Sequence, residues 1–296
     1  MLKRSAEALL ARVGRATDWR MRGRSLVLAY HNILEPGSTP GRDGSLHLER
    51  AVFARQLDYL LTCCEVVAVE SVLAPAAAGD RPRVAITFDD AYLGSLTAGV
   101  AELRERGLPA TVFVTPGFLG GNSFWWDDIR VPAGAGLSDH LREELLTRHG
   151  GQDERIRAAT DPRWSFDAGG SPARTGTEAD LHAAAAYPGL SFAPHSWSHP
   201  NLATVTGSRL AEELERPRSW LTERFPRVLP LLAYPYGLTA PHVERAAAAA
   251  GYTAAFRVSG GWLPQDLRGR YRFPRLGVAA QLSLDGFAAR LAGLLW

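Results

Sequence analysis

The chain has 296 residues, of which 46% are hydrophobic and 22% are charged, so it can bury a large core as an ordinary globular domain. Its 33 basic and 31 acidic residues give a formal net charge of +2, which gives no support for nucleic acid as a partner. No stretch is apolar enough for a transmembrane span, and the first residues lack the continuous apolar core of a secretory signal.

Seven basic residues gather near the N-terminus, between residues 3 and 24. Apolar Leu9, Leu10, Val13 and Trp19 lie among them, a pattern typical of an amphipathic helix. We therefore divide the chain into a basic segment, residues 1–25, expected to be helical, and a main domain, residues 26–296. We favour packing of this helix on the domain, and peripheral contact with a membrane is the alternative.

The two cysteines, Cys63 and Cys64, are adjacent, which is poor geometry for a disulfide between them. Reduced thiols are typical of the cytoplasm, where disulfides are rare. Together with the missing secretory signal, they predict a cytoplasmic protein, peripheral to the membrane if the N-terminal segment binds there.

Strand-like and helix-like segments alternate along the main domain. We expect strands near 26–30, 65–68, 83–88, 110–114, 190–193, 230–234, 253–256 and 272–278, and helices near 49–62, 94–106, 207–224, 240–250 and 284–295. This alternation is typical of βα units and predicts an α/β fold with a parallel, barrel-like sheet. Alternation alone does not distinguish a barrel from a doubly wound sheet.

Two polar motifs directly follow apolar runs. Residues 84–88 lead into Asp89 and Asp90, and residues 190–193 lead into a loop with His195 and His199. Alone, paired aspartates commonly form a turn, and two histidines four apart arise by chance roughly 0.2 times in such a chain. Together, one carboxylate and two imidazoles form a metal site with open positions, as catalytic sites do. The two motifs thus predict a metal-dependent hydrolase.

Seven segments together resemble the polysaccharide deacetylase family, the NodB-homology group of carbohydrate esterases. They occur in the family's order and cover roughly residues 26–278. The segments are Leu28 to His31, Phe53 to Leu57 with Leu60, Val84 to Asp90, Gly107 to Val114, His195 to His199, Tyr234 to Gly237, and Arg272 to Arg275. The resemblance implies a distorted (β/α)7 barrel as a single catalytic domain.

The resemblance also implies roles for individual residues. Asp89 falls where the family has its general base, and Asp90 falls where it has the carboxylate ligand of the metal. His195 and His199 match the two histidine ligands, and the backbone N–H of Tyr236 matches the group that stabilises the oxyanion. Zinc suits such a ligand set, and cobalt, nickel or iron also accept imidazole and carboxylate.

Three features depart from the family's pattern. Ala91 stands where glycine is usual, and because alanine is small we expect little consequence. Ala233 replaces an arginine that orients the base in many members. Arg275 resembles the substitute used by members with a Tyr-Pro-Tyr-Gly motif, because a guanidinium can hold a carboxylate through two bonds. An ordinary surface arginine is the alternative interpretation.

The third departure is the absence of the family's C-terminal Leu-x-His motif, the source of its usual general acid. The tail from Gln281 to Trp296 contains no histidine. His31 is our candidate for this role, because it ends an apolar, strand-like run and would lie at the same rim of the barrel as the other motifs. The alternative is that His31 has a structural role and forms a hydrogen bond with a neighbouring loop.

The reaction that fits these residues is hydrolysis of an N-acetyl group on a sugar, a glycoconjugate or a glycosylated small molecule. Asp89 would take a proton from the attacking water, and a divalent metal would activate the water and polarise the carbonyl. The same site could cleave an O-acetyl ester or a formamide. An inactive, glycan-binding barrel is the alternative of another class, against which the intact Asp89, Asp90, His195 and His199 argue.

Residues 115–185 interrupt the alternation with several glycines and prolines and a short charged helix near 138–147. A long irregular stretch in a compact domain is usually functional or mobile, so we expect an insertion over the active-site face. Its first part holds Trp125 and Trp126 beside Asp127 and Asp128. These tryptophans can stack on sugars, or they can anchor the insertion to the barrel. Trp197, between the two histidines, can form a wall of the pocket that would bind the acetyl group, or it can pack into the interior.

Overall fold

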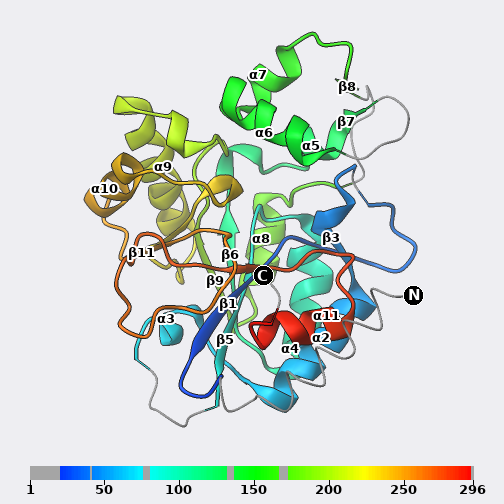
Figure 1. The fold of residues 1–296 in the computed structure, drawn as a ribbon, viewed down its shortest axis with the longest axis vertical. Coiled ribbons are helices and arrows are strands. Elements are labelled where there is room, and N and C mark those ends of the chain that lie inside the picture. Colours follow the sequence, from blue (N-terminus) through cyan, green and yellow to red (C-terminus); the bar gives the residue numbers. More distant parts are fainter. Residues whose placement is uncertain (1–20, 41, 76–80, 132–136, 167–172, 295–296) are drawn as a thin grey trace.

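The computed structural model describes residues 21–40, 42–75, 81–131, 137–166 and 173–294 (Figure 1). Most of the basic N-terminal segment, residues 1–20, lies outside the described residues, so its helix and its membrane contact stay predictions. None of the described helices combines the length and the apolar composition that crossing a membrane requires.

A six-stranded parallel sheet forms the centre of the fold, in the order β12-β1-β5-β6-β9 with β4 beside β5. Each strand except the last lies within two residues of its predicted position, and apart from the short β4 each is a mainly apolar run between polar or glycine-containing segments. The strands are β1 (Ser25–Tyr30), β4 (Glu65–Val66), β5 (Arg83–Phe88), β6 (Ala110–Val114), β9 (Leu190–Pro194) and β12 (Leu276–Gly277).

A second parallel pair, β10 (Leu231–Ala233) with β11 (Ala254–Phe256), continues the ring of strands. Isolated bridges connect this pair to the main sheet, from Phe192 to Val228 on one side and from Phe256 to Phe273 on the other. Among the described residues, the ring of strands therefore lacks a regular ladder at two places, between β9 and β10 and between β11 and β12. The predicted α/β fold with a parallel sheet is confirmed, in the distorted form that the resemblance implied.

The predicted strand at 272–278 is wrong in length, since regular pairing covers only Leu276–Gly277. Pro274 has no N–H to donate to a ladder, so the preceding residues bind β11 through irregular backbone bonds. Two short pairs were not predicted. They are parallel β2 (Asn32–Leu34) with β3 (His47–Glu49), and antiparallel β7 (Ile129–Arg130) with β8 (Ser165–Phe166).

Helices cover the outer face of the sheet, with α2 beside α11 and α9 beside α10 (Figure 1). The helix predicted at 94–106 begins with a π-helical turn, Ser95–Gly99, before its α-helical part. These helices are α2 (Arg50–Cys63), α3 (Val69–Val72), α4 (Val100–Arg106), α8 (Glu178–Ala185), α9 (Gly207–Arg224), α10 (Pro241–Ala249) and α11 (Leu284–Leu291).

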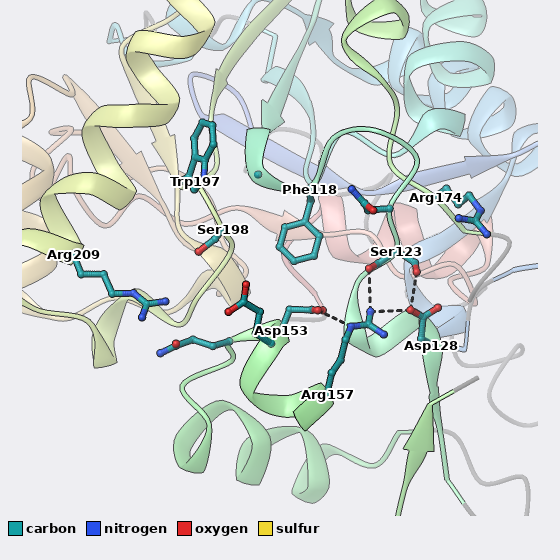
Figure 2. A pocket seen from close by; sticks show the side chains of 13 residues that line it. Phe118, Ser123, Asp128, Asp153, Arg157, Arg174, Trp197, Ser198 and Arg209 are labelled. Carbon is teal, nitrogen blue, oxygen red and sulfur yellow. Dashed lines mark hydrogen bonds and ion pairs between the residues drawn. The ribbon is translucent and has the colours of Figure 1, made fainter. Parts of the chain in front are cut away.

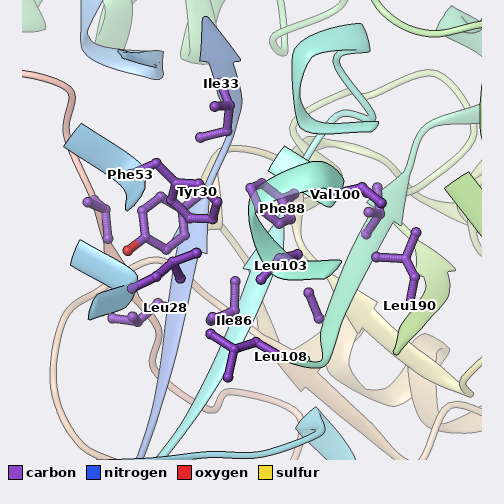
Figure 3. Packing of buried hydrophobic residues seen from close by; sticks show 14 of the residues in the cluster. Leu28, Tyr30, Ile33, Phe53, Ile86, Phe88, Val100, Leu103, Leu108 and Leu190 are labelled. Carbon is purple, nitrogen blue, oxygen red and sulfur yellow. The ribbon is translucent and has the colours of Figure 1, made fainter. Parts of the chain in front are cut away.

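Side chains of each strand alternate between two apolar layers, as the period of two requires. Leu28 and Ile86 pack outward against helix residues such as Phe53 (Figure 3). Val27 and Ala85 instead belong to a second cluster, which fills the inside of the barrel. By the same alternation, Thr87 and Asp89 also face inward, at the carboxyl end of β5.

The segment 115–185 has secondary structure of its own. The helix expected near 138–147 is present as α6 (Asp139–Arg148), flanked by α5 (Trp125–Asp128) and α7 (Asp153–Ala158). These three helices lie together at one end of the molecule and share an apolar cluster with Tyr92 of the barrel (Figure 1). The last helix of the segment, α8, packs against β9 and the π-helical turn as the barrel helices do.

Candidate metal centre and active site

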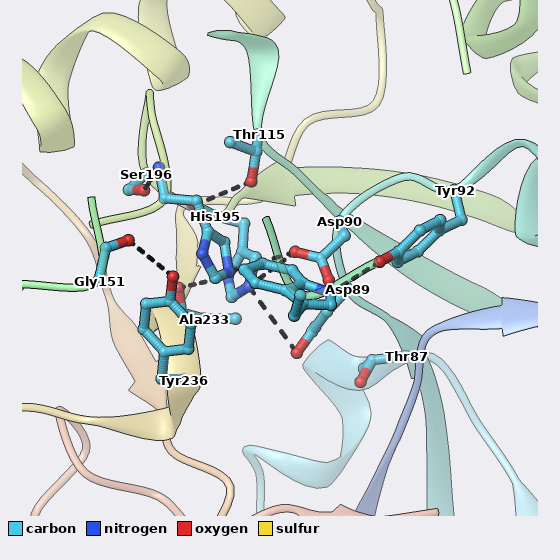
Figure 4. A network of polar contacts seen from close by, with 12 residues as sticks. Thr87, Asp89, Asp90, Tyr92, Thr115, Gly151, His195, Ser196, Ala233 and Tyr236 are labelled. Carbon is cyan, nitrogen blue, oxygen red and sulfur yellow. Dashed lines mark hydrogen bonds and ion pairs between the residues drawn. The ribbon is translucent and has the colours of Figure 1, made fainter. Parts of the chain in front are cut away.

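Residues that the sequence singled out come together where the parallel strands end. Asp89 follows β5, His195 follows β9, and Tyr236 follows β10. Carboxyl ends of parallel strands share one edge of the sheet, so loops far apart in sequence meet there. With Asp90 and His31, these residues line a cavity of about 170 Å³. Figure 4 shows Asp89, Asp90, His195 and Tyr236 at this edge.

Asp90, His195 and His199 form the group predicted to bind a metal. One potential ligand atom from each lies within 4.8 Å of the other two. The Oδ1 atom of Asp90 lies 3.5 Å from His195 Nε2 and 3.3 Å from His199 Nε2. All three side chains are buried.

The polar atoms of this group fit a divalent cation. Within the described part of the chain, the buried Oδ1 of Asp90 has no hydrogen-bond partner. His195 Nδ1 lies 2.8 Å from the carbonyl oxygen of Ala233, which can only accept, so Nδ1 carries the proton and Nε2 keeps a lone pair. Burial lowers the pKa of His195 to about 4, which keeps the imidazole neutral at neutral pH. A carboxylate oxygen without a donor, facing a neutral imidazole, is what a metal site needs.

Asp89 has opposite surroundings, because an arginine takes both of its oxygens. The two terminal nitrogens of Arg275 donate to Oδ1 and Oδ2 over 2.7 Å and 2.6 Å. The Arg275 side chain is 0% exposed, so its interpretation as a surface arginine is wrong. Burial by itself would raise the pKa of Asp89, but Arg275 and His195 hold that pKa well below its usual range.

Residues on the inner face of the barrel hold the Arg275 guanidinium. It donates a further bond of 3.1 Å to the hydroxyl of Thr87 and lies 5.1 Å above the ring of Phe113. Ala233, where many relatives carry the orienting arginine, contributes only a small side chain to the same interior cluster. The ion pair between Arg275 and Asp89 that the resemblance implied is therefore present.

Left-handed backbone is concentrated in the loops of the site. Among described non-glycine residues, six have positive φ, and five of them are Asp90, Ala91, Ser196, His199 and Tyr236. This conformation is costly for residues with a Cβ and persists where the surroundings hold it. Ala91 has φ of 51°, a conformation that glycine adopts at less cost, and glycine is the residue that the resemblance implied as usual there. Our expectation that alanine has little consequence overlooked this strain.

Burial opposes ionisation of Asp90, but the neighbouring His199 and His195 lower the pKa of Asp90 below its usual value. The Tyr236 ring packs edge-on against His199, with 4.6 Å between ring centroids. Its hydroxyl donates to the carbonyl of Gly151 and accepts from Trp125 Nε1. Burial raises the pKa of the Tyr236 phenol, so the ring is neutral and serves packing.

Part of the cavity wall comes from the segment 115–185, which we expected to lie over the active-site face. The Trp126 ring lies 5.0 Å from the His199 ring and lines the cavity. Arg142 of α6 also lines it and forms an ion pair with Asp43. Trp125 is fully buried, so it has no face free for a sugar, which supports the anchoring interpretation. The paired tryptophans were a visible signal, whereas Arg142 had none beyond its charged helix.

Trp197 lies between the two histidines in sequence but faces another space. It lines a separate, larger cavity of about 530 Å³ together with Phe118, Ser198 and Arg157 (Figure 2). One ring face of Trp197 carries the guanidinium of Arg216 at 3.6 Å. Our suggestion that Trp197 walls the acetyl pocket is not supported by this placement.

Comparison with known proteins identifies the family of this chain. The sequence matches the family described as polysaccharide deacetylase over residues 76–255, more than half of the chain. No curated protein sequence matches it.

Solved structures of low sequence identity share the fold. A deacetylase of Streptococcus pyogenes, PplD in complex with acetate, has a TM-score of 0.62 and 16% identity, over 91% of this chain and 99% of its own. IcaB from Ammonifex degensii has a TM-score of 0.62 and 20% identity, over 91% and 97% of the two chains. A de-N-acetylase from Aggregatibacter actinomycetemcomitans has a TM-score of 0.59 and 13% identity, over 90% and 99%. By its sequence match, and consistently with its fold, this chain belongs to the polysaccharide deacetylase family.

Proposed function

We propose that this protein is a metal-dependent deacetylase that hydrolyses an N-acetyl group on a sugar or glycoconjugate. The observation that carries this proposal is the pairing of two carboxylates in one cavity. Asp90 lies with two histidines and lacks a hydrogen bond on Oδ1, and Asp89 is held in place by Arg275. Family membership supports a reaction at acetyl groups of carbohydrates.

In this proposal, Asp90, His195 and His199 hold the metal, for which zinc is our first choice and cobalt or nickel the alternatives. When bound, the cation lowers the pKa of water and polarises the acetyl carbonyl. Asp89 accepts the proton of the attacking water. Each of its oxygens has a lone pair beyond the one that Arg275 uses, and its low pKa keeps it ionised at neutral pH.

Two further residues that line the cavity, Tyr236 and His31, have roles in this proposal. The backbone N–H of Tyr236, in a left-handed turn with φ of 59°, donates to the oxyanion that develops on the acetyl carbonyl. His31 lines the same cavity and donates a proton to the departing amine. An amine leaves poorly without this proton, so a donor in the wall supports an amide substrate over an ester.

The cavity sets a bound on what enters it. At about 170 Å³ it is smaller than the range of roughly 300 to 1,000 Å³ usual for sites that enclose a whole small ligand. We therefore propose that the acetyl group and the adjoining part of one sugar enter. The rest of the glycoconjugate stays outside.

The test is acetate release from N-acetylated and O-acetylated sugars by the purified protein, with and without zinc. We expect zinc-dependent release from an N-acetyl sugar, lost in Asp89→Asn and His195→Ala. The matched controls are Asp266→Asn and His182→Ala, which change exposed residues. Release from O-acetyl sugars alone would favour the esterase, and a protein that binds zinc but releases no acetate would favour the glycan-binding barrel.

A further inference from the structure

A buried hydrogen-bond network lies behind the cavity wall, and the proposed reaction makes no use of it. Asp127 of α5 is its centre. Its Oδ1 accepts from His47 Nε2 over 2.8 Å, and its Oδ2 accepts from the Tyr92 hydroxyl over 2.5 Å. The Tyr92 oxygen in turn accepts from Trp126 Nε1 over 3.0 Å. These four side chains are buried, so the network exchanges no bonds with solvent.

The network joins three segments that are far apart in sequence. His47 begins β3, Tyr92 lies in the loop after β5, and Asp127 belongs to the segment 115–185. His47 is itself fixed from behind, because its Nδ1 lies 3.1 Å from Nδ2 of Asn32. The Asp127 carboxylate accepts a hydrogen bond on each of its two oxygens, from donors in two different segments, so Asp127 fixes where both donors lie.

One arm of the network leads to the Asp90 ligand. Tyr92 is two residues beyond Asp90. Both Asp90 and Ala91, which precede it, have left-handed backbone. Such a strained turn persists only when its ends are held. The Tyr92 ring packs edge-on against His47 and touches Phe124, and its hydroxyl is tied to Asp127. These contacts fix the end of the turn that carries Asp90.

The other arm leads to the His199 ligand. The Trp126 indole N–H is bound by the Tyr92 oxygen, and the indole ring lies 5.0 Å from the His199 ring. His199 Nδ1 has no hydrogen-bond partner among the described residues, unlike His195 Nδ1, which Ala233 holds. Packing must therefore orient the His199 ring, and Trp126 supplies one side of that packing.

We propose that Asp127 is a positioning residue for the metal site. Through Tyr92 it fixes the strained turn of Asp90, and through Tyr92 and Trp126 it fixes the ring of His199. This inference rests on the proposed function, because it takes Asp90, His195 and His199 to be metal ligands. Asp127 itself touches neither substrate nor metal.

The first test is Asp127→Asn, which keeps the shape but replaces one acceptor oxygen by a donor. The affinity of the purified protein for zinc is measured by competition with a chelating dye, and the visible spectrum of the cobalt-loaded protein reports the ligand geometry. We expect the dissociation constant for zinc to rise about tenfold, because substituting a residue that orients metal ligands typically weakens metal binding by this much or more. We also expect the spectrum of the cobalt-loaded protein to change.

The matched control is Asp128→Asn, on the next residue of the same helix. Asp128 is equally buried but binds Ser123 and Arg157, away from Tyr92. We expect its zinc affinity and cobalt spectrum to stay as in the wild type. An equal loss in both variants would overturn the proposal, because it would show a general effect of disturbing α5.

Tyr92→Phe keeps the ring and removes the hydroxyl that Asp127 and Trp126 share. We expect it to weaken zinc binding as Asp127→Asn does, and the double variant to lose less than the product of the two single effects. This variant also decides the question if Asp127→Asn does not fold. Multiplicative losses, or wild-type affinity in Tyr92→Phe, would overturn the proposal.

The outcome distinguishes this inference from the proposed function. A wild-type protein that binds no zinc or cobalt would contradict the metal site itself. A wild-type protein that binds one zinc ion, together with an Asp127→Asn variant of equal affinity and equal cobalt spectrum, would overturn the positioning role alone.

Discussion

The barrel interior around Asp89 and the cavity wall around Asp90 treat two neighbouring carboxylates in opposite ways. Asp89 faces the interior of the barrel, where Arg275 donates one hydrogen bond to each of its two oxygens. Asp90 is turned aside by a left-handed backbone toward two histidines, and its Oδ1 lacks a hydrogen bond. The residues after β5 thus include one carboxylate that is paired with Arg275, which we call the closed pair, and one carboxylate, Asp90, with an oxygen that accepts no hydrogen bond, which we call the open group. The closed pair should matter for stability, and the open group should matter for cation binding.

The largest effect should come from breaking the closed pair. Arg275→Met leaves Asp89 buried without its partner, so we expect a loss of about 3 to 5 kcal/mol in the free energy of unfolding. The control is Arg272→Met in the same segment, where an arginine whose side chain is 58% exposed binds Glu244. An exposed pair should cost no more than about 1 kcal/mol. Urea unfolding measures both, and equal losses would contradict the comparison.

The pH dependence of stability should also report the closed pair. Because the folded-state pKa of Asp89 is lower than its ordinary value of 3.8, the pair's contribution is fully present above that value. It is lost as the pH falls below it, at no more than about 1.4 kcal/mol per pH unit. The difference in unfolding free energy between wild type and Asp89→Asn should therefore be constant from neutral pH to about 5. A difference that already shrinks near neutral pH would show that the carboxylate is not held by Arg275.

A smaller effect is expected from Thr87→Val, which keeps the shape but removes a hydroxyl that accepts from Arg275 and donates to the carbonyl of Leu28. The loss should be about 1 kcal/mol, because the two bonds to Asp89 remain. Thr97→Val is the control, since that exposed hydroxyl binds only the carbonyl of Leu93. Calorimetric unfolding would measure both, and a loss for Thr97→Val as large as for Thr87→Val would contradict the reasoning.

The smallest effect should be a gain. Ala91→Gly relieves a left-handed alanine, which costs roughly 1 to 2 kcal/mol, against an entropic cost of roughly 0.5 to 1 kcal/mol for glycine. We expect a net stabilisation of less than about 1 kcal/mol. Ala101→Gly, in the interior of α4, should have the opposite sign. If both variants lose stability in thermal unfolding, the turn at Asp90 is not strained.

Much of the sheet could be predicted because its strands are local apolar runs that end in polar motifs. That reasoning also brought Asp89, Asp90, His195 and His199 to one edge. It failed at 272–278, where Pro274 prevents a regular ladder. The pairing of Arg275 with Asp89 spans 186 residues in sequence, so only the resemblance to a family could indicate it.

The sequence predicted that the segment 115–185 lies over the active-site face, but local pattern did not show how its residues contact the site. Trp126 and Arg142 reach the site because the segment 115–185 packs on the barrel. The hydrophobic pattern of that segment does not indicate where on the barrel it packs. His47 and Tyr92 gave no signal, because a histidine and a tyrosine near strand ends have many uses. Only the three-dimensional contacts with Asp127 connect them to the ligands.

The most direct test of the account compares Asp89→Asn with Asp90→Asn in urea unfolding, each with and without zinc. Without zinc, Asp89→Asn should lose about 3 kcal/mol because Arg275 stays buried without its partner, whereas Asp90→Asn should change little. Zinc at a hundred times its dissociation constant should stabilise the wild type and Asp89→Asn by about 2.7 kcal/mol, and Asp90→Asn by nothing. Equal losses without zinc, or equal stabilisation of Asp90→Asn by zinc, would contradict the account.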